Sequence, residues 1–303
     1  MKHSYNLDEI GEIPGDVDRY AVIGDPVDHS LSPDLHQAGF NGINRQANYV
    51  RIHLSPDQLE AGIQKMREMR FKGWNCTLPH KAKLMELIDE SSENAQLMRA
   101  TNTILNENGK LIGFNTDGEG WVRAIREEFF VDIRDMRIMV LGIGGAGQAI
   151  ATQAAIESCE RLVLVNRTVD KAQRIASSIE HYFESEQLVG AEQKLKVIPF
   201  EEEPVKEELN TIDLVVNCMS LGLKSSDPPV LPSRVLQPHL FVYDTIYKPS
   251  KTKLLQAAEK VGARCANGLS MLLHQGALSF EIWTGVEAPL AEMRQALKKA
   301  LTE

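Results

Sequence analysis

The fold of this chain is decided by residues 137–147, which read RIMVLGIGGAG. The first five letters are typical of a short buried strand, and the glycine-rich remainder runs into an alanine-rich helix that extends to about Ile156. A strand, a tight glycine turn and a helix start in this order allow backbone N–H groups to approach a pyrophosphate. We therefore predict a Rossmann-type dinucleotide-binding domain. Its turn consists of Gly142, Ile143, Gly144, Gly145 and Ala146.

A second apolar strand, residues 162–165, ends in Asn166, Arg167 and Thr168. An NAD site usually has an acidic residue here that accepts a hydrogen bond from the ribose 2′-hydroxyl, whereas an arginine suits a 2′-phosphate. The sequence therefore predicts NADP as the cofactor. Because the glycine turn begins near the midpoint of the chain, we expect the residues before it to form a separate substrate domain.

The composition is typical of a soluble globular protein. The chain has 303 residues, of which 43% are hydrophobic and 25% charged, and this length suits one large or two ordinary domains. The net charge of −9 argues against nucleic acid or an anionic membrane as a partner. The cysteines are scattered, without a C-x-x-C pair, as free thiols in a reducing cytosol would be. We expect a cytoplasmic monomer or homodimer that binds a small molecule.

The rest of the chain alternates strands with helices, which predicts a two-domain α/β protein with mostly parallel sheets. Strands are expected at residues 20–24, 48–54, 74–77, 195–198, 214–217 and 241–244. Helices are expected from Ser32 onward, over 56–69, 81–89, 270–283 and 288–301.

The predicted domain limits follow from this order of elements. Residues 19–118 together with 270–303 should form the substrate-binding and catalytic domain, and residues 119–269 the Rossmann domain. Residues 1–18 are polar and acidic, without the apolar run of a signal peptide. We expect them to form a loosely ordered extension.

The first of three polar stretches in the first half is GDPVDHSLSP at residues 24–33. Its hydroxyls Ser30 and Ser32 stand just before a helix start. Together with the N–H groups of that helix, they could hold a carboxylate. Simple capping of the helix by Ser32 is the alternative.

The other two stretches follow predicted strands. In GWNCTLPHK, residues 73–81, a proline stops the strand and Lys81 opens the next helix, at a strand end of the kind that faces the ligand crevice in open α/β sheets. In the third stretch, a hairpin with an Asn108-Gly109 turn should bring Asn102 and Asp117 to the same sheet edge. The alternatives are a solvated lysine and ordinary turn residues.

Taken together, these stretches resemble the shikimate dehydrogenase family. The patterns H-S-x-S-P, N-x-T-x-P-x-K, N-T, N-T-D-G, G-x-G-G-A-G and N-R-T occur in the family's order, followed by GLSMLLHQG at 268–276 and WTG at 283–285. The likeness covers roughly residues 19–300. It implies NADPH-dependent reduction of 3-dehydroshikimate to shikimate, a step in aromatic amino acid biosynthesis.

The resemblance also implies a role for individual residues. The catalytic pair would be Lys81 and Asp117. The substrate carboxylate would be held by Ser30 and Ser32, and the ring hydroxyls would be contacted by Thr77, Asn102, Tyr247 and Gln275. NADP would be lined by the backbone of 142–146, by Asn166, Arg167, Thr168 and Lys171, and by Thr245 and Gly268. Arg167 and Lys171 would meet the 2′-phosphate.

These roles make chemical sense. A protonated Lys81 could stabilise negative charge on the reacting oxygen and supply a proton, while Asp117 orients the ammonium group. Because the catalytic pair and the cofactor would lie on different domains, we expect the domains to close over the ligands.

Some positions depart from the family's commonest pattern, notably Ser270, where glycine is usual, and Arg99 and Thr101, which replace Gly and Val. They leave open a quinate/shikimate or aminoshikimate dehydrogenase, including one that uses NAD. A non-catalytic ligand sensor is a further alternative, which the presence of both Lys81 and Asp117 opposes. We expect no metal, because His29 and His36 lack a third ligand at recognisable spacing.

Overall fold

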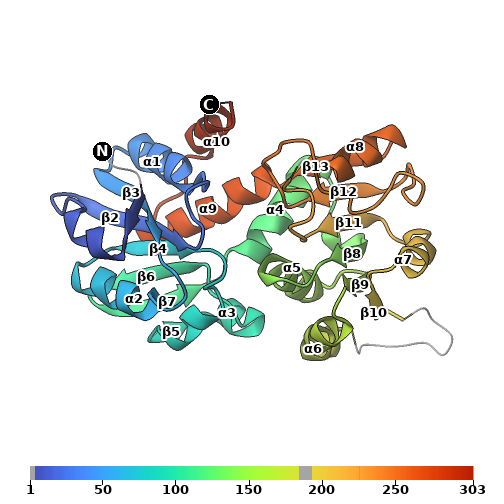
Figure 1. Ribbon diagram of the computed structural model, residues 1–303, viewed down its shortest axis with the longest axis horizontal. Coiled ribbons are helices and arrows are strands. Elements are labelled where there is room, and N and C mark those ends of the chain that lie inside the picture. The colour runs from blue at the N-terminus through green and yellow to red at the C-terminus, as the bar shows by residue number, and fades with distance from the viewer. Residues whose placement is uncertain (1–3, 184–192, 225, 303) are drawn as a thin grey trace. The chain divides into compact units, whose positions relative to one another are not determined.

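The structure is a computed structural model that describes residues 4–183, 193–224 and 226–302. The chain divides into two compact units, the first formed by Met1–Gly120 with Leu272–Glu303 and the second by Trp121–Met271. Each unit is built around its own sheet, with helices packed against it (Figure 1). The unit boundaries fall inside two helices, α4 (Asp117–Phe129) and α9 (Leu269–Thr284).

The described strands of the first unit follow the order β1-β3-β2-β4-β6-β7-β5. They are β1 (Ser4–Asn6), β2 (Asp18–Gly24), β3 (Ala47–His53), β4 (Gly73–Cys76), β5 (Glu90–Ser91), β6 (Thr103–Glu107) and β7 (Lys110–Phe114). Strands β1, β3, β2 and β4 are parallel, whereas β6 runs antiparallel to both β4 and β7. The hairpin of β6 and β7 turns at Asn108 and Gly109, both with positive φ, as the sequence predicts.

The helices of the first unit cover both faces of this sheet. They are α1 (Ser32–Gly42), α2 (Leu59–Glu68), the short α3 (Glu93–Met98), most of α9, and α10 (Leu290–Ala300), which lies beside α1 (Figure 1). In α2, Leu59, Ile63 and Met66 are buried, as the helical spacing of these apolar residues predicts.

The predicted helix over residues 81–89 is wrong. Only a 3₁₀ turn, η2 (Lys83–Glu86), forms there, followed by the short strand β5. The carbonyl of Lys81 accepts a hydrogen bond from the Thr101 N–H at 2.9 Å instead of closing a helical turn. This contact ties the segment after β4 to the start of β6, and so it places Lys81 beside the hairpin.

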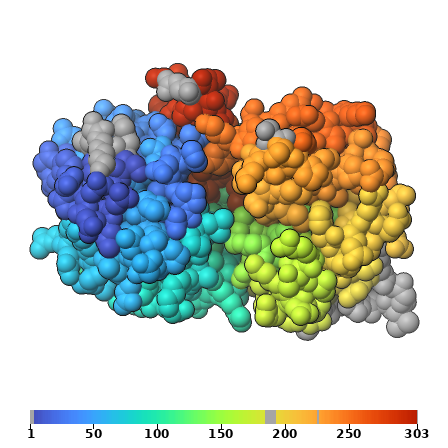
Figure 2. Space-filling model, in the orientation of Figure 1, coloured from blue at the N-terminus to red at the C-terminus, as the bar shows by residue number. Residues whose placement is uncertain are grey.

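The N-terminal segment also differs from the prediction. In place of a loose extension, Ser4–Asn6 forms β1, which pairs in parallel with β3, and a 3₁₀ helix follows (η1, Leu7–Glu12). Ile10 is fully buried and anchors the segment to the core on the α2 side. Figure 2 shows this dark-blue segment as part of the surface of the first unit. The polar composition of this segment gave no sign that it is ordered. One strand pairing and a few buried side chains are enough to hold it in place.

The described strands of the second unit are all parallel, in the order β10-β9-β8-β11-β12-β13. They are β8 (Arg137–Leu141), β9 (Arg161–Asn166), β10 (Leu195–Pro199), β11 (Leu214–Asn217), β12 (Phe241–Asp244) and β13 (Arg264–Asn267). The helices are α5 (Gly145–Ile156), α6 (Val169–Ile179), α7 (Glu202–Leu209) and α8 (Lys253–Lys260). Apolar clusters fill both faces of the sheet, which confirms the predicted Rossmann-type α/β fold.

A buried charge cluster ties α7 to the sheet of this unit. Glu208 accepts a hydrogen bond from Arg161 Nη2 at 2.7 Å, and a second from Lys196 Nζ. Burial alone would raise the pKa of Glu208, but the hydrogen bonds from Lys196 and Arg161 outweigh it and lower that pKa. Within the described ranges, no helix combines the length and apolar character needed to cross a membrane.

Candidate active site

Lys81 and Asp117 meet in the first unit. Lys81 lies in the turn after β4, and Asp117 is the first residue of α4. Lys81 Nζ donates to Asp117 Oδ2 at 2.6 Å, and the two side chains are only 15% and 7% exposed. Because both charges are largely withdrawn from water, each depends on the other for stabilisation. The pair therefore forms a fixed ammonium and carboxylate at the C-terminal end of β4.

Asn102 holds this pair in place. Its Nδ2 donates to Asp117 Oδ1 at 2.9 Å and lies 3.3 Å from Gln275 Oε1. Its Oδ1 accepts the backbone N–H of Thr116 at 2.9 Å, which fixes the orientation of the amide. The predicted residues Asp117, Asn102 and Gln275, which are far apart in the sequence, thus converge on one point.

Behind Asn102 lies a buried polar network that the sequence analysis did not assign to the site. Asn75 accepts a hydrogen bond from the Tyr49 hydroxyl at 2.7 Å and donates to the Ser279 hydroxyl at 3.0 Å. Ser279 also lies 2.8 Å from the Thr103 hydroxyl and donates to the Gln275 carbonyl at 2.9 Å. Asn75 is the first residue of the N-x-T-x-P-x-K pattern, so the sequence could have assigned it to the site. For Ser279 the only indication in the sequence is its position one helical turn after Gln275.

The predicted carboxylate cradle lies at the start of α1. Leu31 occupies the N-cap position, so Ser32 does not cap the helix as the alternative proposed. Ser30 Oγ accepts the Ser32 N–H at 3.2 Å. Burial raises the pKa of Tyr49 well above its ordinary value, against the opposing effect of a hydrogen bond with Ser32. The Ser32 hydroxyl therefore lies against Tyr49, on the side of the Asn75 network.

Thr77 and Tyr247 are placed differently. Thr77 follows β4 directly, and its N–H donates to the Ile23 carbonyl at 2.9 Å, so it lies between β4 and Lys81 in the first unit. Tyr247 belongs to the second unit, shortly after β12.

The glycine turn of the second unit has the geometry that a close ligand approach requires. Gly142 adopts φ +89°, and a Cβ on Gly147 would lie 1.9 Å from the Gly142 carbonyl oxygen. Residues 144–146 are half-buried at the N-terminus of α5, where backbone N–H groups are available to an anion. The Ile143 N–H donates to Asn166 Oδ1 at 3.1 Å, which joins the turn to the end of β9.

The other predicted cofactor residues lie after the strands β9, β12 and β13 of the same sheet. Arg167, Thr168 and Lys171 are exposed at the start of α6. Thr245 donates its hydroxyl to the Asn217 carbonyl at 2.8 Å, and a Cβ on Gly268 would lie 2.0 Å from the Thr245 carbonyl oxygen. Thr245 and Gly268 are therefore brought together after β12 and β13.

Two of the departures from the family pattern, Ser270 and Thr101, have side-chain partners in the structure. The Ser270 hydroxyl lies 3.1 Å from the Tyr243 hydroxyl. The buried Thr101 hydroxyl donates to Met85 Sδ at 3.1 Å. Arg99 is exposed and closes α3 at φ +48°.

The two histidines that were considered as metal ligands, His29 and His36, lie in different environments. His29 is exposed, whereas His36 is fully buried and stacks on Tyr49, with ring centroids 4.5 Å apart. Within residues 4–183, 193–224 and 226–302, no group of three or more His, Cys, Asp or Glu side chains could hold a metal ion.

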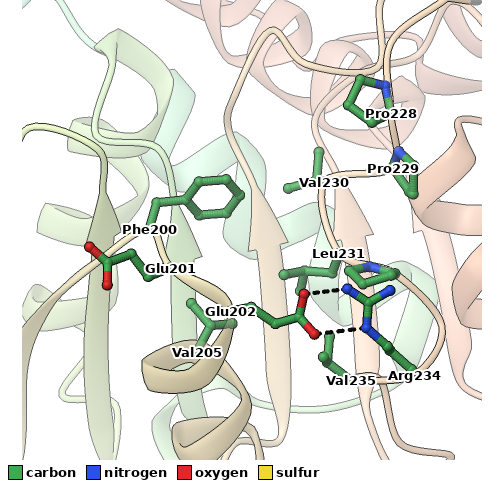
Figure 3. Close-up of a pocket in the computed structure, with 11 residues that line it drawn as sticks. Phe200, Glu201, Glu202, Val205, Pro228, Pro229, Val230, Leu231, Arg234 and Val235 are labelled. Atoms are coloured by element: carbon green, nitrogen blue, oxygen red, sulfur yellow. Dashed lines mark hydrogen bonds and ion pairs between the residues drawn. The ribbon is translucent and has the colours of Figure 1, made fainter.

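A separate recess of about 380 Å³ lies in the second unit, between the start of α7 and residues 228–235 (Figure 3). Phe200 and Val230 contribute apolar walls. Arg234 and Glu202 form a two-pronged ion pair beside them, with Nε to Oε1 at 2.7 Å. The recess contains none of the predicted catalytic or cofactor residues.

Comparisons with known proteins agree along the chain. Residues 22–104 match a family described as the shikimate dehydrogenase substrate binding domain, residues 124–220 one described as shikimate / quinate 5-dehydrogenase, and residues 268–298 one described as the shikimate 5'-dehydrogenase C-terminal domain. A shikimate dehydrogenase (NADP(+)) from Methanopyrus kandleri is 39% identical over 282 residues, which cover 92% of this chain and 94% of that protein.

Solved structures agree as well. A shikimate dehydrogenase in complex with NADP+ superimposes with a TM-score of 0.86 at 35% identity, covering 96% of this chain and 98% of that one. The shikimate 5-dehydrogenase from Thermus thermophilus in complex with NADP(H) and shikimate has a TM-score of 0.82 at 31% identity, over 94% of this chain and 100% of that chain.

Proposed function

The chain belongs to the shikimate dehydrogenase family, and we propose that it interconverts 3-dehydroshikimate and shikimate with NADP(H). The observation that carries the proposal is the contact of Lys81 with Asp117, at 2.6 Å, beside Asn102 and Gln275. An ammonium group, a carboxylate and two amides at one strand end form a site that can bind ring hydroxyls and move a proton.

The proposed chemistry uses each of these groups. Reduction of the ring carbonyl develops negative charge on its oxygen, and the Lys81 ammonium would stabilise that charge and deliver the proton. Asp117 holds the ammonium at 2.6 Å and would accept a hydrogen bond from a neighbouring ring hydroxyl. Asn102 donates a hydrogen bond to the carboxylate at 2.9 Å, which would orient the pair before the substrate binds. We assign Ser30 and Ser32 to the substrate carboxylate, and Thr77, Tyr247 and Gln275 to the ring hydroxyls.

The second unit fits NADP. The turn at Gly142 and Gly147 has no room for a Cβ at its closest point, and it opens onto the half-buried N-terminus of α5, which suits a pyrophosphate. The exposed cations Arg167 and Lys171 are suited to the 2′-phosphate. When bound, the cofactor supplies or accepts the hydride. Thr245 and Gly268 would lie against its nicotinamide end.

We further propose how the chain is organised around these roles. Residues 19–118 with 270–303 would carry substrate binding and catalysis, and residues 119–269 would carry the cofactor. We place the enzyme in the cytoplasm because Cys76, Cys159, Cys218 and Cys265 are all free thiols.

Replacement of the lysine tests the proposal. Lys81→Ala should lower kcat for shikimate oxidation by about 10²–10⁴-fold, the usual contribution of a positioned acid or base. NADP affinity, measured by calorimetry, should change little, because Lys81 belongs to the other unit. Lys83→Ala is the matched control: Lys83 lies two residues further on and is 61% exposed.

Initial rates with shikimate and quinate, each with NADP and NAD, complete the test. The proposal predicts the highest kcat/KM for shikimate with NADP. Undiminished turnover in Lys81→Ala would remove this lysine from the mechanism, and a preference for quinate would assign the chain to the related activity.

A further inference from the structure

We propose that Arg51 is a positioning residue for the substrate carboxylate, which shapes the Ser30–Ser32 cradle and supplies its positive charge. The inference rests on the proposed function, since it concerns the site assigned there to the carboxylate of shikimate. Arg51 lies on β3, outside every motif of the sequence analysis, and nothing in its sequence context marks it as functional.

The contacts of Arg51 are directed at the cradle backbone. Its Nε and Nη2 both donate to the Ser30 carbonyl oxygen, at 3.0 and 2.5 Å, and Nη2 lies 3.5 Å from Asp34 Oδ2. The side chain is only 16% exposed, so the guanidinium is held in place and not free in solvent. Arg51 therefore fixes the loop from behind, between Ser30 and the first turn of α1.

This contact also polarises the peptide that joins Ser30 to Leu31. A carbonyl that accepts two hydrogen bonds from a cation leaves the N–H of the same peptide a stronger donor. That N–H belongs to Leu31, the N-cap of α1, between the two serine hydroxyls. Arg51 thus strengthens the donors of the cradle without contacting the substrate itself.

The charges around the cradle explain why a cation is needed there. Asp25, Asp28 and Asp34 all lie in or beside this loop, in a chain whose net charge is −9. Asp25 lies 2.9 Å from His53 Nε2, and Asp28 accepts the Ser4 hydroxyl at 2.9 Å, so both carboxylates are held near the loop. An incoming carboxylate meets these negative charges, and the Arg51 guanidinium opposes them. Its charge also acts on the buried Tyr49 beside the cradle, where it opposes part of the rise in pKa that burial causes.

The test compares a charged ligand with its neutral counterpart. Dissociation constants for shikimate and for its methyl ester are measured by calorimetry on the full chain, for the wild type, Arg51→Gln and Arg51→Lys. Arg51→Gln should weaken shikimate binding by a factor of about five to thirty, the range expected for unit charges about 8 Å apart at an effective dielectric constant of roughly 20–40. Binding of the methyl ester should weaken by a clearly smaller factor, because the ester depends on the shape and the donors of the cradle but carries no charge for Arg51 to attract. Arg51→Lys keeps the charge and should restore most of the shikimate affinity.

The matched control is Arg45→Gln. Arg45 precedes the same strand and is likewise partly buried in an ion pair, with Asp18 at 2.8 Å. It should leave both dissociation constants unchanged, and thermal unfolding checks that the variants fold. Equal weakening of shikimate and its ester in Arg51→Gln would mean a merely structural role and would overturn the inference, as would unchanged shikimate binding.

Turnover is recorded in the same experiment, as kcat and KM. An inactive wild type that still binds shikimate in an Arg51-dependent way would refute the proposed function and leave the carboxylate site standing. Normal wild-type turnover, together with shikimate binding that does not depend on Arg51, would refute the role of Arg51 and leave the proposed function standing.

Discussion

Replacing His36 should change how the stability of the protein depends on pH. His36 is fully buried in α1, with its ring stacked on Tyr49 at 4.5 Å and tilted against Trp283 at 5.0 Å. Within the described part of the chain, neither ring nitrogen has a hydrogen-bond partner of good geometry. Burial lowers the pKa of His36 from 6.5 to about 3, against a smaller upward effect of Asn75. The folded protein therefore keeps this ring neutral at pH values where the unfolded chain protonates it.

The sign and size of the effect follow from this difference. Above pH 6.5 the ring is neutral in both the folded and the unfolded state, so it does not change the free energy of unfolding. Below pH 6.5 the unfolded chain binds a proton on His36 and the folded protein does not, so the free energy of unfolding falls as the pH falls toward 3. Each pH unit within that window corresponds to about 1.4 kcal/mol. When the pH is lowered from 7.5 to 5.0, only the interval from 6.5 to 5.0 contributes. Over that interval the free energy of unfolding of the wild type should fall by about 2 kcal/mol because of His36.

Urea unfolding of the wild type and His36→Gln at the two pH values isolates this contribution, because the other titrating groups are common to both proteins. At pH 7.5 the variant should be the less stable, since it gives up the ring stacking. At pH 5.0 its deficit should shrink by about 2 kcal/mol. His36→Leu, which also lacks the ring, should show the same pH-dependent change despite a different absolute stability. A stability difference between wild type and variants that stays constant with pH would refute the reasoning.

Two further predictions concern the second unit. Gly147→Ala would place a Cβ 1.9 Å from the Gly142 carbonyl oxygen, so the glycine turn must shift. Calorimetry should then show NADP affinity falling at least about tenfold, or about 1.4 kcal/mol. An unaltered affinity would mean that the turn does not hold the cofactor. Glu208→Gln removes the buried carboxylate that pairs with Lys196 and with Arg161, whose side chain is 5% exposed, and should lower the free energy of unfolding by about 3–5 kcal/mol. The exposed Glu202→Gln removes an ion pair with Arg234 and should lower the free energy of unfolding far less in the same urea titration, because solvent screens that pair. Equal losses in the two variants would contradict the importance of burial.

Much of the fold could be predicted because its signals are local. The strand, glycine turn and helix at residues 137–156 appear as expected, since buried parallel strands read as apolar runs and the turn needs glycine. In contrast, β13 (Arg264–Asn267) was not predicted. Its letters, RCAN, carry no strand pattern, and its extended form comes from pairing with β12.

The site was predictable where topology brings strand ends together. The hairpin suffices to suggest that Asn102 and Asp117 lie close to one another, as they do. The pairing of Lys81 with Asp117 was implied by the family resemblance, and the structure has it. The residues behind them were not predictable, because their partners are remote: Ser279 meets Thr103 across 176 positions of sequence. Arg51 likewise meets Ser30 only through the pairing of β3 with β2, which a single sequence does not reveal.

A shortened chain that began near Tyr20 would lack β1 and leave β3 as the outer strand of its sheet. β1 pairs with the last three residues of β3, Arg51–His53, and the backbone groups of these residues would then have no strand to bond with on that side. A longer unpaired edge is a template on which a second molecule can add its own strand. The polar first residues, which look dispensable, therefore protect the protein against edge-to-edge aggregation.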